Sequence, residues 1–240
     1  MNEKENSESY HVINRESFQR LQCYRCLALI ALLFLLLSIF PYIVAVILPR
    51  WMTIRVSKEG DDSHASVIQL GIFGEWVSEK RNDTFAPAVW ISHFPPQPGH
   101  DRINDVDLPH YYNTQAVFAV LTILLMLLSF LLGLYSLKHH RYVFKRLTAG
   151  VLLLAALCSF VVIQVLDKSI DEWNFRLRTS RTPDAVAKEE VGFSWHIAWL
   201  VTLINVVVAV CLMLASHKQK GEEAAAAEFE VEDRPIHIGR

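Results

Sequence analysis

Four long apolar segments constrain the fold of this chain more than any other feature. They cover Leu27–Pro49, Thr114–Leu137, Leu147–Leu166 and Phe193–Ala215, and none contains an Asp, Glu, Lys or Arg. Each has about 20 residues or more, which as a helix is long enough to cross a hydrocarbon core about 30 Å thick. The chain is 52% hydrophobic, but a soluble protein does not collect its apolar residues into four uninterrupted blocks. The sequence therefore predicts an integral membrane protein with four spans.

Basic residues near the ends of these segments predict their orientation, because cytoplasmic loops are enriched in Lys and Arg. The short loop 138–146 has four basic residues and no acid, whereas the loops 50–113 and 167–192 are mixed and slightly acidic. Basic residues also precede the first segment and follow the fourth (Arg15, Arg20, Arg25, Lys218 and Lys220). We expect both termini and the loop 138–146 in the cytosol and the two longer loops outside the cell.

The chain divides into three parts: a polar cytosolic segment, 1–26, a four-span domain, 27–215, and an acidic, Ala-rich tail, 216–240, expected to be disordered in the cytosol. Short connections favour antiparallel neighbours, so the predicted fold is an all-α, left-handed, up-down four-helix bundle. Small residues of the third segment would allow close helix packing (Ala149, Gly150, Ala155, Ala156 and Ser159). Three polar residues of the spans would hydrogen-bond across helices (Ser129, Gln164 and Asn205).

The first outer loop predicts a small antiparallel sheet outside the membrane. Apolar residues alternate in Trp51–Val56 and in Val67–Phe73, and Ala88–Phe94 is a third candidate strand. Alternation with a period of two, bounded by Gly, Asp and Pro, is typical of strands with one buried face. In the second outer loop, Trp173–Leu177 alternates in the same way and would add an edge strand.

Three side chains are candidates for covalent modification. The only N-x-S/T sequon begins at Asn82 in the first outer loop, which agrees with an extracellular position for that loop. Cys23 and Cys26 lie beside the first segment on the cytosolic side, where S-palmitoylation is favoured. A redox or metal pair is disfavoured, because the cytosol is reducing and this C-x-x-C lacks a second pair of ligands. Two inert thiols are the remaining alternative.

Residues capable of catalysis or metal binding form no recognisable pattern. The histidines of the first outer loop match no metal-ligand spacing and are interpreted as solvated (His64, His93, His100 and His110). Asp101, Asp105 and Asp107 lack the spacing of a calcium loop and are interpreted as a hydrated turn. We expect a structural hydrogen bond for His196. The spans hold no formally charged residue and the chain has no nucleophile–base motif, so we predict neither an enzyme nor a cofactor.

Other features indicate what surrounds the protein. The basic loop 138–146 is placed to touch anionic lipid headgroups, although topology explains its charge equally well. Aromatic residues near the outer ends of the spans fit an interfacial belt (Tyr111, Tyr112, Trp173, Trp195 and Trp199). A formal net charge of −2 gives no reason to expect nucleic-acid binding. The C-terminal Arg240 is not the apolar residue that PDZ grooves capture, so a PDZ partner is not expected.

Short motifs stand at the edges of the four segments. Trp51 is followed by Gly71-Ile72-Phe73, the second segment opens with Thr114-Gln115-Ala116-Val117-Phe118-Ala119, the third with Leu147-Thr148-Ala149-Gly150, and the fourth with Gly192-Phe193-Ser194-Trp195-His196-Ile197-Ala198-Trp199. In this order they resemble the W…G-L-W, L-Q-A-x-x-A, third-span and G-Y-S-Y-x-x-A-W motifs of the claudin, peripheral myelin protein and epithelial membrane protein superfamily. The resemblance covers roughly residues 27–215 and rests most on seven positions (Trp51, Gly71, Phe73, Gln115, Ala116, Gly150 and Trp199).

The resemblance implies a four-helix bundle carrying a small extracellular sheet, with one departure. The family signature continues with two cysteines that form a disulfide in the first outer loop. Here Trp76 stands at the position of the first, and no cysteine lies between Cys26 and Cys158. The chain is therefore identified as a divergent member of the superfamily. We expect aromatic packing to hold its sheet together (Trp51, Phe73, Trp76 and Trp90).

The functions that the resemblance implies are not enzymatic. We predict a plasma-membrane protein that acts in cell–cell contact or membrane organisation, meeting other membrane proteins through its outer loops. The alternative is an auxiliary subunit that regulates an ion channel or receptor, as calcium-channel gamma subunits do within the same superfamily. The missing loop cysteines weaken a paracellular barrier role and leave the auxiliary role open.

Overall fold

The computed structural model describes residues 2–58, 61–81, 84–94, 108–138, 142–180 and 185–216. In these ranges the chain forms four long helices: α1 (Asn2–Ile47), α2 (Leu108–Lys138), α3 (Tyr142–Ser180) and α4 (Phe193–Leu214). Each contains a stretch that is long and apolar enough to cross a membrane: Cys26–Ile47, His110–Leu137, Val143–Glu172 and Phe193–Leu214. The four predicted spans are thus confirmed as helices.

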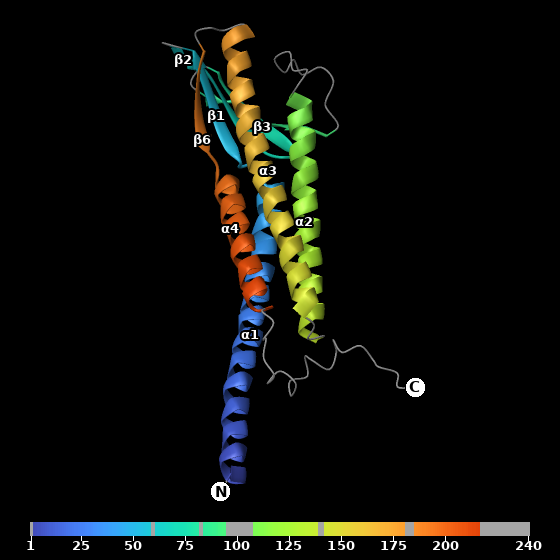
Figure 1. Ribbon diagram of the computed structural model, residues 1–240. Helices are drawn as coiled ribbons and strands as arrows, with labels where there is room; N and C mark the ends of the chain where they lie inside the picture. Colours follow the sequence, from blue (N-terminus) through green and yellow to red (C-terminus); the bar gives the residue numbers. More distant parts are fainter. Residues whose placement is uncertain are drawn as a thin grey trace, which may run out of the picture.

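The helices form a bundle with a sheet at one end. Helix α1 packs against α2 and α4, and α3 packs against the same two helices. The first half of α1 continues beyond the bundle at the end opposite the sheet (Figure 1). Small residues of α3 are buried at these contacts, as expected (Ala149, Ala155, Ala156 and Ser159). Gly150 differs, because a Cβ atom built on it would meet nothing within 4 Å.

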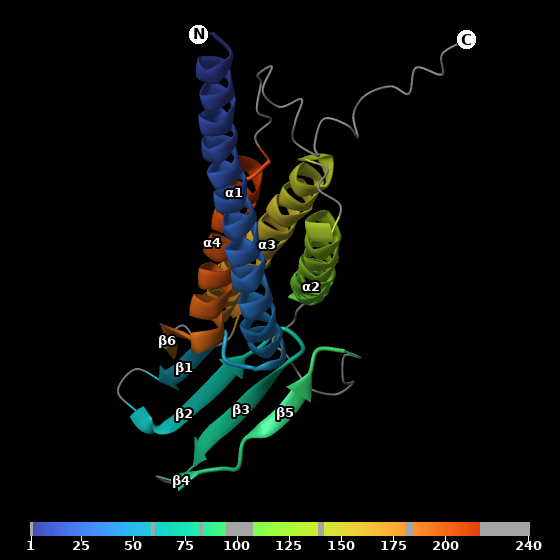
Figure 2. The same cartoon turned by 90° about the horizontal axis from the view of Figure 1, so that it is seen from below.

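Six strands make up the sheet: β1 (Met52–Lys58), β2 (Asp61–Leu70), β3 (Gly74–Arg81), β4 (Thr84–Phe85), β5 (Val89–Ser92) and β6 (Ala185–Val191). Their order is β4-β3-β2-β1-β6, and β5 pairs with β3 on the same side as β4. All the pairs are antiparallel. Figure 2 shows the strands side by side across the end of the bundle.

The sheet agrees with the predicted strands in part. Strands β1, β2 and β5 overlap the three candidates in the first long loop, whereas β3 and β4 were not predicted. The edge strand predicted at Trp173–Leu177 is wrong, because α3 continues through it to Ser180. Extending an existing helix adds one hydrogen bond per residue without a new nucleation cost, which outweighs five alternating residues. The second long loop does supply an edge strand, but that strand is β6.

Several sequence predictions fall outside the described residues. Asn82, His100 and the three aspartates of the expected hydrated turn (Asp101, Asp105 and Asp107) lie in the gaps between the described ranges, and so does nearly all of the tail 216–240. Of the predicted inner loop 138–146, only 139–141 fall outside the described residues, because α2 extends to Lys138 and α3 begins at Tyr142. The side chains of His64 and Trp173 are likewise not described.

Candidate functional site

Trp51 ties α1, the sheet and α4 together where the chain leaves the bundle. Its side chain is fully buried, and its indole Nε1 donates a hydrogen bond to the Ala45 carbonyl at 2.7 Å. Its backbone N–H donates to Leu70 on β2 at 3.0 Å, and its carbonyl accepts from Gly192 at 2.9 Å. One residue therefore fixes the position of three elements.

Two glycines allow the backbones to approach closely at the same place. A Cβ on Gly71 would lie 2.7 Å from the Cα of Pro49, and one on Gly192 would lie 2.1 Å from the carbonyl oxygen of Arg50. Both distances are shorter than side-chain carbons tolerate, and the atoms they would meet belong to backbone. Only glycine fits there without moving the sheet relative to the bundle.

The sheet has one face buried on the bundle. Met52, Ile54, Leu70 and Ile91 are buried, and the first three belong to one apolar core together with residues of all four helices. Alternate residues of each strand therefore point away from the bundle. We call that side the outer face.

One row of register partners crosses the outer face. It runs from Glu190 on β6 through Thr53, Gln69 and Trp76 to Trp90 on β5. Cross-strand partners point to the same side of a sheet, so these five side chains share the outer face. At one end Glu190 pairs with Arg55 at 3.0 Å, and both side chains are exposed. The other end is aromatic.

Trp76 and Trp90 form an exposed pair, called here the aromatic pair. Their ring centroids lie 5.3 Å apart, and each residue is 37% exposed. A Cβ on Gly74 would lie 2.3 Å from the ring of Trp90, so that ring covers Gly74. The register and the glycine fix the position of both indoles on the outer face. A positioned, partly exposed tryptophan pair is suited to contact another protein.

The four aromatic residues predicted to hold the sheet do not form one cluster. Trp51 packs into the bundle, whereas Phe73 contacts Phe94 edge-to-face at 6.4 Å and Trp76 contacts Trp90. The prediction of aromatic packing is correct, but the packing is divided among three places. In the resemblance described above, Trp76 stands at the position of the first loop cysteine.

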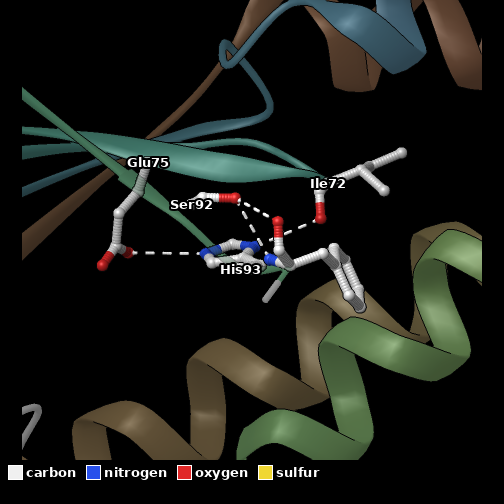
Figure 3. A network of polar contacts seen from close by, with 5 residues as sticks. Ile72, Glu75, Ser92 and His93 are labelled. Carbon is white, nitrogen blue, oxygen red and sulfur yellow. Dashed lines mark hydrogen bonds and ion pairs between the residues drawn. The ribbon is translucent and has the colours of Figure 1, made fainter. Parts of the chain in front are cut away.

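His93 directly follows β5 and lies on the side of the sheet opposite the aromatic pair. Figure 3 shows its side chain between Ile72 and Glu75. Its imidazole is completely buried and stacks on the ring of Tyr112 at 3.8 Å. Its Nδ1 donates to the Ile72 carbonyl at 3.1 Å, and its backbone N–H donates to Phe73 at 2.9 Å. The expectation of a solvated histidine is therefore wrong for His93. The sequence signal was its spacing of two residues from the buried Ile91, which places both on one face of the strand.

The remaining described histidines do not join this network. His110 is exposed on α2, and His196 is exposed on α4 with its ring edge-on to Trp195 at 5.1 Å. The described residues contain no group of three or more His, Cys, Asp or Glu side chains that is placed to hold a metal ion.

The polar residues predicted to bond across the spans behave differently from one another. Gln164 is exposed on α3, and Ser129 and Asn205 are buried, but their side chains have no hydrogen-bond partner among the described residues. The cross-helix hydrogen bond that does occur joins the Thr202 hydroxyl on α4 to Ser159 on α3 at 2.8 Å. It tightens the contact that the small residues of α3 create.

At the other end of the bundle, Lys145 caps a helix instead of facing lipid. It is buried, and its Nζ donates to the carbonyl of Ala215 at 3.4 Å, just after the end of α4. A cation is favoured there because the last carbonyls of a helix lack partners within it. Cys23 and Cys26 are both exposed on α1, with free thiols.

Three further residues of the motifs at the edges of the spans lie on the helices, two of them buried and one partly exposed. Gln115 and Ala116 are buried on α2. Trp199 is partly exposed on α4 and contacts Phe160 and Trp195 edge-to-face, at 5.8 and 5.9 Å. The contact of Trp199 with Phe160 joins α4 to α3.

Comparison with protein families gives one match. The family described as PMP-22/EMP/MP20/Claudin tight junction matches residues 36–216, which is well over half of the chain. In a comparison with curated proteins, none matches.

Proposed function

Because this chain belongs to the PMP-22/EMP/MP20/claudin family of four-span membrane proteins, we propose that it acts in contact between cells through the outer face of its sheet. The aromatic pair is the observation that carries this proposal. Tryptophan is enriched at the centres of protein interfaces, and a pair held by register loses little conformational freedom on binding. The charged pair Arg55–Glu190 at the other end of the row would supply a polar rim.

The proposal requires the sheet outside the cell at the plasma membrane, with both termini in the cytosol. The distribution of Lys and Arg supports this orientation. The sheet and the two helix ends that the basic connection joins, the last turn of α2 and the first turn of α3, lie at opposite ends of the bundle (Figure 1). Membrane lipids would surround the spans, and proteins of the same or the opposing membrane would meet the outer face. We propose no catalytic activity and no cofactor.

Cell aggregation tests the proposal. Non-adherent cells expressing the protein should form clusters, and Trp76→Thr/Trp90→Thr should reduce clustering to the level of untransfected cells. Threonine suits a strand but removes the aromatic surface. The matched control is Trp76→Phe/Trp90→Phe, which keeps an aromatic pair and should retain most of the clustering. Both variants are compared at equal surface density, and unchanged clustering by the threonine variant would reject the proposal.

A second experiment, in epithelial cells, distinguishes the alternative role as an auxiliary subunit of a channel or receptor. In an epithelium, the tagged protein should concentrate at lateral contacts. Co-purification with a pore-forming subunit, together with uniform surface distribution, would support the auxiliary role instead.

A further inference from the structure

The buried imidazole of His93 faces oxygen atoms with both of its ring nitrogens. Nδ1 lies 3.1 Å from the Ile72 carbonyl, and Nε2 lies 3.9 Å from Oε2 of Glu75 (Figure 3). A carbonyl oxygen can only accept, so the hydrogen bond places a proton on Nδ1. A neutral imidazole carries one N–H, and its Nε2 then presents a lone pair toward the carboxylate. Nε2 accordingly has no hydrogen-bond partner in the described part of the chain.

Adding one proton changes this geometry. An imidazolium has two N–H donors and can bond to the Ile72 carbonyl and the Glu75 carboxylate at the same time. A distance of 3.9 Å is too long for a hydrogen bond, so the two side chains must approach by about 1 Å to form one. Such a bond is charge-assisted and lies where water is largely excluded, because Glu75 is only 13% exposed and His93 not at all.

Two ionisable side chains are in contact with the imidazole of His93 or face it. Glu75 comes from β3, and Tyr112, whose ring stacks on the imidazole, comes from α2. The turn Gly71–Phe73 contributes backbone carbonyls. The Ser92 hydroxyl closes the turn after β5 by donating to the Phe94 carbonyl at 2.7 Å. His93 is thus enclosed by β3, the turns beside it and the start of α2.

These contacts lie directly behind the aromatic pair. Glu75 precedes Trp76 and pairs in register with Ile91, which follows Trp90. We propose that His93 and Glu75 form a proton-operated clamp, in which protonation adds a side-chain bond between β3 and the end of β5, two strands already paired in register, and holds both against α2. If the outer face acts in cell contact as proposed above, the clamp regulates how firmly the aromatic pair is held. A lower pH would stabilise the binding face.

Hydrogen–deuterium exchange of the full-length protein in lipid nanodiscs tests the clamp. Protection factors, corrected for the intrinsic dependence of exchange on pH, are compared at about pH 7.5 and about pH 5.5, which bracket the range where histidine changes charge. The amides of residues 89–94 should become about tenfold better protected at the lower pH, as expected when one charge-assisted hydrogen bond is gained. Equal protection at the two values would overturn the proposal.

Two variants and a control identify the groups responsible. Glu75→Gln removes the carboxylate but keeps its size, and His93→Phe keeps the stacking on Tyr112 without a titratable ring. Each should abolish the pH dependence, and Glu75→Gln gives a result even where His93→Phe fails to fold. His110→Gln changes an exposed histidine on α2 and should leave the pH dependence intact. A pH dependence that persists in Glu75→Gln would contradict the clamp, and so would one that persists in a folded His93→Phe. Exchange requires no adhesion, so a failed aggregation assay and a failed clamp remain distinguishable.

Discussion

Trp51 shows how a single residue of this chain supports both the bundle and the sheet. The Ala45 carbonyl that accepts its indole N–H belongs to the last turn of α1, where carbonyls have no partner within the helix. Trp51→Phe keeps most of the packing but leaves that carbonyl unpaired and buried. We expect the variant to unfold about 1–3 kcal/mol more easily. Thermal unfolding in detergent micelles measures the change, and Trp199→Phe, at a partly exposed tryptophan, is the control. Equal losses in both variants would contradict the role of the N–H.

Asn205 is a single residue whose substitution should stabilise the protein, in contrast to that of Trp51. Both amide atoms are buried in α4 and have no hydrogen-bond partner among the described residues. An unsatisfied buried amide costs free energy, and leucine has nearly the same shape without that cost. Asn205→Leu should therefore raise the melting temperature in micelles, by an amount equivalent to about 1–3 kcal/mol. Thr202→Val, which removes a hydroxyl that does have a partner on α3, should lower it. A lower melting temperature for Asn205→Leu would mean that the amide is satisfied in the folded protein.

Among the elements, the helices were predictable and part of the sheet was not. Each span is an uncharged apolar block, and backbone groups in lipid must be satisfied within a helix, so few alternatives exist. Strands β1 and β2 alternate strongly and were predicted. Strand β3 has charged residues on both sides of a short apolar stretch, among them Glu75, Glu79 and Arg81. These charges obscure the alternation of apolar and polar residues that would predict a strand. The place of β3 was set by pairing with β2, a contact between segments that no local pattern records.

Some residues of the candidate site can likewise be predicted from the sequence, and others cannot. The sequence indicates Trp51 and Trp76 directly, because Trp51 matches a position of the family signature and Trp76 replaces one. The prediction is wrong for His93, because the sequence alone does not place the strand beside it, and a histidine in a polar loop is then interpreted as solvated. The partnership of Trp76 with Trp90 was also not predictable in detail, since it depends on the register of β3 against β5.

That register makes a prediction about the strands themselves. Partners directly opposite in an antiparallel pair have Cα atoms about 4.5–5.5 Å apart, which is within the range that a disulfide spans. Trp76→Cys/Trp90→Cys should therefore form a disulfide when the protein is made in an oxidising compartment, detected by mass spectrometry of peptides from unreduced protein. Trp76→Cys/Ser92→Cys is the matched control, because Ser92 is displaced by one same-face position and pairs with Gly74. The absence of a bond in the first variant, or efficient bonding in the second, would refute the register.

At the scale of the whole molecule, the two ends of the bundle differ in chemistry. The end with the sheet carries the aromatic pair and the buried His93. The other end carries Lys145, which holds the C-terminus of α4, and the two exposed thiols of α1. A membrane between these ends would expose them to different enzymes, so covalent modifications report the orientation of the whole protein.

Glycosylation at Asn82 and S-acylation at Cys23 and Cys26 should therefore occur on the same molecule, on opposite sides of the membrane. Glycosidase treatment of protein from a glycosylating cell should increase gel mobility, and Asn82→Gln should remove that shift. Thioester-specific exchange should label the wild type and not Cys23→Ser/Cys26→Ser, which should still carry the glycan. Cys158→Ser, at a thiol buried within the bundle, should leave both signals unchanged. A glycan lost with the cysteines would indicate failed export. Acylation without any glycan, in a protein that reaches the surface, would contradict an extracellular position for Asn82.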